Sequence, residues 1–141
     1  MITVLIIDDN DMDRRLAVQV LQDAARNNHS RIEIIQARDG EAGLWALENR
    51  EPDLVVCDID LKRKVNAVGD RIPEGLDLIR LACAKELDVI AYYGQAIEGT
   101  WAMIPAAARK ANKSLGQAGL RAQLIGILGH AERHHGLAHA G

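Results

Sequence analysis

Residues 3–9 are Thr3-Val4-Leu5-Ile6-Ile7-Asp8-Asp9, an apolar run that ends in two acids. Continuous runs of β-branched and other apolar residues are typical of strands that are buried on both faces, as in a parallel sheet. A second run of this kind, Leu54-Val55-Val56-Cys57, ends at Asp58. The sequence therefore predicts buried strands that lead directly into carboxylates.

Helical spacing of apolar residues separates these runs from further strand-like segments. Helices are predicted over residues 12–26 and 120–133, from Gly40 through Leu47 to an end before Pro52, and from Leu76 onward. Further strands are predicted over residues 32–35 and 88–93. Residues 95–114, which are rich in Ala and contain Pro105, should hold a helix and a short fifth strand. This alternation predicts an α/β fold: a doubly wound, flavodoxin-like, five-stranded parallel sheet flanked by helices.

The length and composition fit one globular domain. The chain has 141 residues, of which 48% are hydrophobic and 26% charged. We expect the domain to span residues 1–133 and to be followed by a flexible tail over residues 134–141, which contain His and Gly. The net charge of −3 gives no reason to expect nucleic-acid or membrane binding. Cys57 and Cys83 lack metal-ligand spacing, so we expect reduced thiols and a cytoplasmic protein.

Three acids are expected to meet at one edge of the sheet. The strands that precede Asp8-Asp9 and Asp58 are commonly neighbours in a doubly wound sheet, and sites form at the carboxyl ends of such strands. Carboxylates held close together resist ionisation, and a hard divalent cation relieves this repulsion. Mg²⁺ uses one or two carboxylates together with a phosphate, so the pattern predicts a Mg²⁺ site that receives a phosphoryl group.

The chain resembles the receiver domains of response regulators (CheY-like) over residues 2–93, and residues 94–130 resemble them poorly. Four motifs carry the resemblance, in the order that the family has them: Ile6-Ile7-Asp8-Asp9 followed by Arg14-Arg15-Leu16, then Asp39-Gly40-Glu41-Ala42, then Pro52-Asp53-Leu54-Val55-Val56-Cys57-Asp58-Ile59-Asp60-Leu61, and finally Glu74-Gly75-Leu76-Asp77-Leu78-Ile79-Arg80.

The resemblance implies a role for each acid. Asp58 would be the nucleophile that takes a phosphoryl group from a phosphohistidine. Asp9 would bind Mg²⁺ directly, and Asp8 would bind it directly or through water. Asp60 would offer its backbone carbonyl to the metal while its side chain points outward. The chemistry is reasonable, because a carboxylate attacks a charged phosphoryl group poorly until a cation neutralises it.

The resemblance also implies a phosphate-pairing lysine and a set of partners. In the family this lysine ends the fifth strand and precedes a proline. Lys113, in Lys113-Ser114, is the best match, and Lys110 is the alternative. The implied partners are a histidine kinase or a histidine phosphotransfer protein, and a downstream protein. The expected role is that of a stand-alone, stoichiometric phosphoacceptor rather than an enzyme.

The chain departs from the family pattern in its second half. The loop between Asp58 and Gly75 is about twice the usual length and contains Lys62-Arg63-Lys64 and Arg71. Tyr93 stands where the family has Thr or Ser, either as a packing residue or with a direct role. Lys110 stands where the family has an aromatic residue.

Two alternatives to a phosphoacceptor follow. A pseudo-receiver would keep the fold and bind partners without control by phosphate, as the changes at Tyr93 and around Lys113 favour. The second alternative is a phosphatase of the haloacid-dehalogenase type, because Asp58-Ile59-Asp60 resembles the first motif of that class. That motif normally opens the chain and continues to Thr, whereas Lys62 occupies the corresponding place here.

Overall fold

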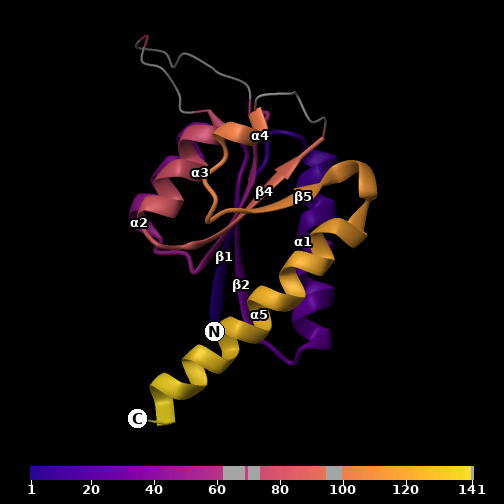
Figure 1. Ribbon diagram of the computed structural model, residues 1–141, viewed down its shortest axis with the longest axis vertical. Coiled ribbons are helices and arrows are strands. Elements are labelled where there is room, and N and C mark those ends of the chain that lie inside the picture. The colour runs from indigo at the N-terminus through magenta and orange to yellow at the C-terminus, as the bar shows by residue number, and fades with distance from the viewer. Residues whose placement is uncertain (62–68, 70–73, 95–99, 141) are drawn as a thin grey trace.

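The computed structural model describes residues 1–61, 69, 74–94 and 100–140, with only the backbone described at residues 100, 101, 115 and 130–140. Its centre is a sheet with helices on both faces (Figure 1). The strands are β1 (Ile2–Ile7), β2 (Ile32–Ala37), β3 (Leu54–Asp58), β4 (Asp88–Tyr93) and β5 (Arg109–Asn112). They pair in parallel in the order β2-β1-β3-β4-β5, which confirms the doubly wound sheet.

The helices follow the strands in alternation. They are α1 (Asp11–Asn27), α2 (Gly40–Asn49), α3 (Gly75–Ala84), the short α4 (Thr100–Met103) and α5 (Gln117–Ala140), with a 3-10 turn, η1 (Lys113–Leu115), before α5. Helices α1 and α5 cover one face of the sheet, and α2 and α3 cover the other (Figure 1). None of the helices in the described part of the chain is apolar over the length that a bilayer requires.

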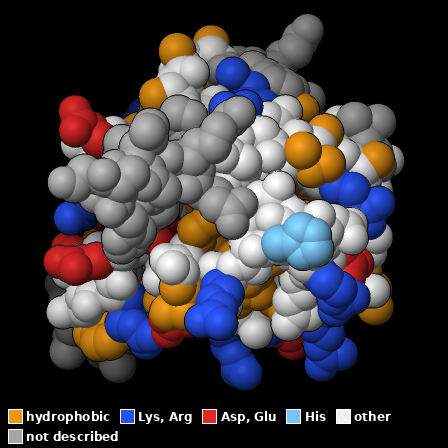
Figure 2. Space-filling view, turned by 90° about the horizontal axis from the view of Figure 1, so that it is seen from below, with side chains coloured by type: hydrophobic (Ala, Val, Ile, Leu, Met, Phe, Trp, Pro, Cys, Tyr) orange, Lys and Arg blue, Asp and Glu red, His pale blue; other side chains and the backbone are white. Residues whose placement is uncertain are grey.

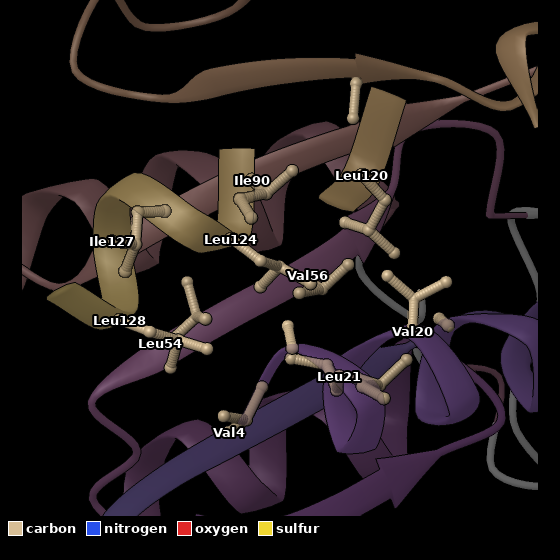
Figure 3. Packing of buried hydrophobic residues seen from close by; sticks show 14 of the residues in the cluster. Val4, Val20, Leu21, Leu54, Val56, Ile90, Leu120, Leu124, Ile127 and Leu128 are labelled. Atoms are coloured by element: carbon tan, nitrogen blue, oxygen red, sulfur yellow. The ribbon is translucent and has the colours of Figure 1, made fainter. Parts of the chain in front are cut away.

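Alternate residues of the central strands supply the two halves of the core, because successive side chains of a strand point to opposite faces. On the α1 and α5 face, the strand residues Leu54, Val56 and Ile90 meet Val20, Leu21, Leu120, Leu124, Ile127 and Leu128 (Figure 3). On the α2 and α3 face, the alternate residues Leu5, Val55 and Val89 meet Leu47, Leu78 and Ile79. Full burial of each large apolar side chain contributes about 2 kcal/mol, so both faces hold their helices firmly.

Side-chain caps fix where two of the helices begin. The Asn10 side chain accepts a hydrogen bond from the Asp13 amide at 2.9 Å, and the Asp39 side chain accepts one from the Ala42 amide at 2.8 Å. Such caps satisfy backbone donors that have no partner inside the helix. The cap at Asn10 places the first turn of α1 immediately after Asp8 and Asp9.

Helix α5 and strand β5 refine the predictions for the end of the chain. The helix continues to Ala140, whereas the sequence predicted that it would end at Arg133 and be followed by a loose tail. Gly136 costs a helix only about 1 kcal/mol, and Leu137, Ala138 and Ala140, which follow it, are good helix formers. The division into a domain and a flexible tail stays a prediction. Strand β5 lies where a short fifth strand was expected, and most of the long basic loop (residues 62–68 and 70–73) is outside the described residues.

Candidate functional site

Buried charge marks one end of the sheet. The charged side chains that are buried in the described part of the chain are Asp8, Arg14 and Asp58, and all lie at or beside the carboxyl ends of β1 and β3. The opposite end, seen from below in Figure 2, carries basic and acidic side chains on its surface. Burying a charge is costly unless it is paired, so the carboxyl end is where a function has to be sought.

Three carboxylates converge there as the sequence predicted. Strands β1 and β3 are neighbours, and Ile7 lies opposite Cys57. The next residues, Asp8 and Asp58, therefore lie at the same level of the sheet. Asp8, Asp9 and Asp58 each offer a carboxylate oxygen, and these oxygens lie within 4.8 Å of one another. Asp8 and Asp58 are buried and Asp9 is half-buried, so the group opens toward solvent on the Asp9 side.

Burial makes both inner acids harder to ionise. It raises the pKa of Asp58 to about 7, against the opposing charge of Lys113 and with the help of the nearby Asp8 charge. It also raises the pKa of Asp8, although the Asn10 amide and Lys113 act in the opposite direction. The Asn10 amide donates to Asp8 Oδ1 at 2.9 Å. Removal from water disfavours a carboxylate, so a further cation would be stabilised beside this pair.

Lys113 supplies one cation to the site. It begins η1, directly after β5, and its Nζ lies 3.0 Å from Asp8 Oδ2 and 3.5 Å from Asp58 Oδ2. Burial alone would lower the pKa of this ammonium, but the charges of Asp58 and Asp8 outweigh it and raise the pKa above its usual value. Lys110 lies within β5, where its backbone is opposite Ala91 in the strand register. Of the two candidate lysines, Lys113 is therefore the one that the fold brings to the acids.

Asp13 and Tyr92 also contact Lys113, and the sequence analysis identified neither. Asp13 Oδ2 lies 3.0 Å from the Lys113 Nζ, and the Tyr92 ring lies beneath this nitrogen at 5.2 Å from its centroid. Asp13 looks like an ordinary acid in the first turn of a helix. The sequence around Asp13 gives no sign of this contact, because Lys113 is 100 residues away along the chain. Tyr92 lies opposite Asp58 in the strand register.

Arg14 fixes the backbone beneath the acids. Its side chain is buried, and its Nη1 donates to the Asp8 carbonyl at 3.0 Å. The same guanidinium donates to Gln36 Oε1 at 3.2 Å and pairs with Asp11 at 2.5 Å. The guanidinium therefore donates to three different acceptors at once, which holds the chain firmly where it leaves β1.

The chain beyond Asp58 is held by Asp60 and Gly75. The Asp60 amide donates to Asp58 Oδ1 at 3.0 Å, and the Asp60 side chain is exposed, as the resemblance implied. A Cβ atom at Gly75 would lie 2.0 Å from the Asp58 carbonyl oxygen. Only glycine lets α3 approach the nucleophile's backbone this closely. Tyr93 is 7% exposed at the end of β4, beside this region.

The donor set fits Mg²⁺. All the candidate ligands are oxygens, and two of the three carboxylates are buried close to one another. A cation there would offset the cost of burial that raises the pKa of Asp58. Mg²⁺ is typically held by few carboxylates and keeps several waters, so the open side at Asp9 suits it.

Comparison with known proteins shows which solved structures share this fold. No protein-family model and no curated protein sequence matches this chain. Among solved structures, a CheY-like response regulator receiver domain protein from Methanospirillum hungatei JF-1 is 22% identical, with 95% of this chain and 98% of that chain covered and a TM-score of 0.69. A two component transcriptional regulator AraC from Clostridium phytofermentans ISDg is 21% identical, with 96% and 98% covered and a TM-score of 0.71.

A chemotaxis protein gives the same result. The Vibrio cholerae chemotaxis protein CheY4 is 18% identical, with 91% of this chain and 99% of that chain covered and a TM-score of 0.66. The TM-scores and the strand order, rather than the low identities, establish the fold, and the fold of this chain is that of CheY-like response regulator receiver domains.

Proposed function

We propose that this chain is a response-regulator receiver that accepts a phosphoryl group on Asp58 with the help of Mg²⁺. The observation that carries the proposal is the meeting of Asp8, Asp9 and Asp58 within 4.8 Å, with Lys113 against two of them. Receiver-like structures cover almost the whole chain, which supports a signalling role over that of a classical enzyme.

Each residue of the site would have its own role in the phosphoryl transfer. A carboxylate oxygen of Asp58 would attack the phosphorus of a phosphohistidine, forming an O–P bond as the N–P bond breaks. The imidazole nitrogen takes the bonding electrons. The Asp60 amide orients the carboxylate through Asp58 Oδ1, and the Lys113 ammonium faces the side of Asp58 Oδ2. Bound Mg²⁺ would neutralise charge on the incoming phosphoryl oxygens.

The metal would be held by the groups that the sequence predicted as its ligands. Asp9 and Asp58 are the natural direct ligands, because Asp9 lies on the open side and Asp58 carries the transferred group. Asp8 is already paired with Lys113 at 3.0 Å, so it would bind directly or through water. Asp60, with its side chain exposed, would contribute its backbone carbonyl.

The proposed partners follow from this chemistry. A histidine kinase or a histidine phosphotransfer protein would supply the phosphoryl group, and a downstream protein would respond to it. The thiols of Cys57 and Cys83 are unpaired with each other, which fits a reducing compartment, and we place the protein in the cytoplasm.

A pseudo-receiver is the alternative, and particular residues favour it. Tyr93 and Lys110 stand where the family has a small hydroxyl and an aromatic residue, so the usual means of reading the phosphorylated state is altered. Such a protein would bind its partner equally well in the presence and absence of phosphate.

Phosphoryl uptake can be tested by intact mass. The protein would be incubated with Mg²⁺ and acetyl phosphate, and separately with a histidine kinase and ATP. We expect wild type to gain the mass of one phosphoryl group, Asp58→Asn to gain none, and Asp88→Asn, changed at an exposed acid where β4 begins, to behave as wild type. No adduct from either donor would support the pseudo-receiver, and steady phosphate release from simple esters would support a phosphatase.

A further inference from the structure

The contact between the Asp13 carboxylate and the Lys113 ammonium takes no part in the phosphoryl transfer proposed for Asp58. Asp13 lies in the first turn of α1, where its own amide donates to the Asn10 side chain at 2.9 Å, so its backbone is fixed by the helix cap. From this position its carboxylate reaches the Lys113 Nζ at 3.0 Å. The Asp13 side chain is 34% exposed, in contrast to the buried Asp8 and Asp58.

The position of Lys113 is set by unequal contacts. Its two short contacts, each of 3.0 Å, go to Asp8 and Asp13, and the longer one of 3.5 Å goes to Asp58. An ammonium has three donors in a compact head, and it moves toward the acceptors that hold it most strongly. The ammonium is thus drawn toward the α1 side, with the Tyr92 ring beneath it.

A phosphoryl group on Asp58 would change this balance. Its oxygens would present several negative charges on the side where Lys113 now has its longest contact. Asp8 would share its charge with the metal, which weakens its hold on the ammonium. Asp13 would then be the carboxylate outside the metal group that still competes for Lys113, and its partial exposure allows water to replace the lysine there.

We propose that Asp13 is a positioning residue that competes with the phosphoryl group for Lys113 and so lowers the affinity of the site for a phosphoryl group on Asp58. This inference rests on the proposed function, because it assumes that Asp58 is the acceptor. Asp13 would set how readily the domain enters its phosphorylated state, without touching the reacting atoms.

Beryllofluoride, which binds a carboxylate in the shape of a phosphoryl group, measures this affinity without phosphate turnover. Its dissociation constant would be determined by isothermal titration calorimetry with saturating Mg²⁺. We expect Asp13→Asn to bind about twofold to fivefold more tightly than wild type, the upper part of the range of one partly exposed ion pair. Asp23→Asn is the matched control, since Asp23 also lies on α1, is 33% exposed and pairs with Arg26 instead.

A second background tests whether Asp13 acts through Lys113. In Lys113→Met, or in Lys113→Gln if the first variant does not fold, Asp13→Asn should leave the dissociation constant unchanged. An equal gain in this background would mean that Asp13 acts only as a nearby charge, and the positioning role would be wrong. Circular dichroism and thermal unfolding would confirm that each variant is folded.

The outcomes separate the inference from the function on which it rests. Wild type that binds beryllofluoride, together with an Asp13→Asn variant that binds no more tightly, overturns the inference and leaves the phosphoacceptor intact. Wild type that neither binds beryllofluoride nor gains a phosphoryl group overturns both.

Discussion

The ammonium nitrogen of Lys113 lies 3.5 Å from Asp58 Oδ2 although β5, which delivers it, is a short strand with one buried residue. The same nitrogen lies 3.0 Å from Asp8 Oδ2, so one lysine faces both buried carboxylates. An internal cation of this kind offsets part of the cost of burying two like charges. It also leaves Lys113 at the place where it could meet an incoming phosphoryl group.

Lys113→Met is therefore expected to destabilise the protein. Without the ammonium, two buried carboxylates face each other unpaired, and losing one partner of a buried pair costs about 3 kcal/mol at about pH 8. Urea unfolding followed by circular dichroism measures this loss. The exposed Lys85 provides the control, since Lys85→Met should change the free energy of unfolding by less than about 0.5 kcal/mol. Equal effects of the two substitutions would show that Lys113 does not stabilise the acids.

Asp58 should make the stability of the metal-free protein fall as the pH rises. Its pKa is about 7 in the folded protein and near the ordinary 3.8 when unfolded, so between these values the folded state binds more protons. The stabilisation is complete below about pH 4 and is lost as the pH rises through about 7. Each pKa unit corresponds to about 1.4 kcal/mol, so the loss for a buried group is about 2–4 kcal/mol.

Asp58→Asn tests this assignment. Asparagine has no charge to gain, so the variant should lose less stability than wild type between about pH 5 and about pH 8, and should be the more stable protein at the higher pH. Urea titrations across this range in the presence of EDTA would show the difference. Parallel profiles for the two proteins would mean that Asp58 does not titrate in this window.

The residues that the sequence identified are those whose roles are local. Strands β1, β3 and β4 could be predicted because each is buried along most of its length, and Asp8, Asp9 and Asp58 because they come directly after apolar runs. Strand β5 lies at the edge of the sheet and buries only Ala111, so no apolar run marked it. The contact between Asp13 and Lys113 depends on how α1 and η1 pack, which no local pattern encodes.

Mg²⁺ is expected to stabilise the folded protein, because it binds converged carboxylates that are dispersed in the unfolded chain. At a concentration of about ten times its dissociation constant, it should raise the free energy of unfolding by about 1.4 kcal/mol, and EDTA should reverse the gain. Asp9→Asn removes the ligand on the open side and should abolish most of this response, whereas Asp88→Asn should retain it. A full Mg²⁺ response in Asp9→Asn would place the metal elsewhere.

Gly75→Ala should disturb the site through the backbone alone. The added Cβ would lie 2.0 Å from the Asp58 carbonyl oxygen and 2.8 Å from that of Ile59, so α3 must move away from the end of β3. We expect a loss of about 2–4 kcal/mol in the free energy of unfolding, together with slower phosphorylation, because the chain that carries Asp58 shifts.

Gly129→Ala is the matched substitution for this test. Its Cβ would meet nothing within 4 Å, and Gly129 lies inside α5, so the change should stabilise the helix by about 1 kcal/mol. Urea unfolding of both variants, with phosphorylation rates from acetyl phosphate, separates the two effects. If Gly75→Ala proved as stable and as readily phosphorylated as Gly129→Ala, the close approach of α3 to Asp58 would have no bearing on how the nucleophile is held.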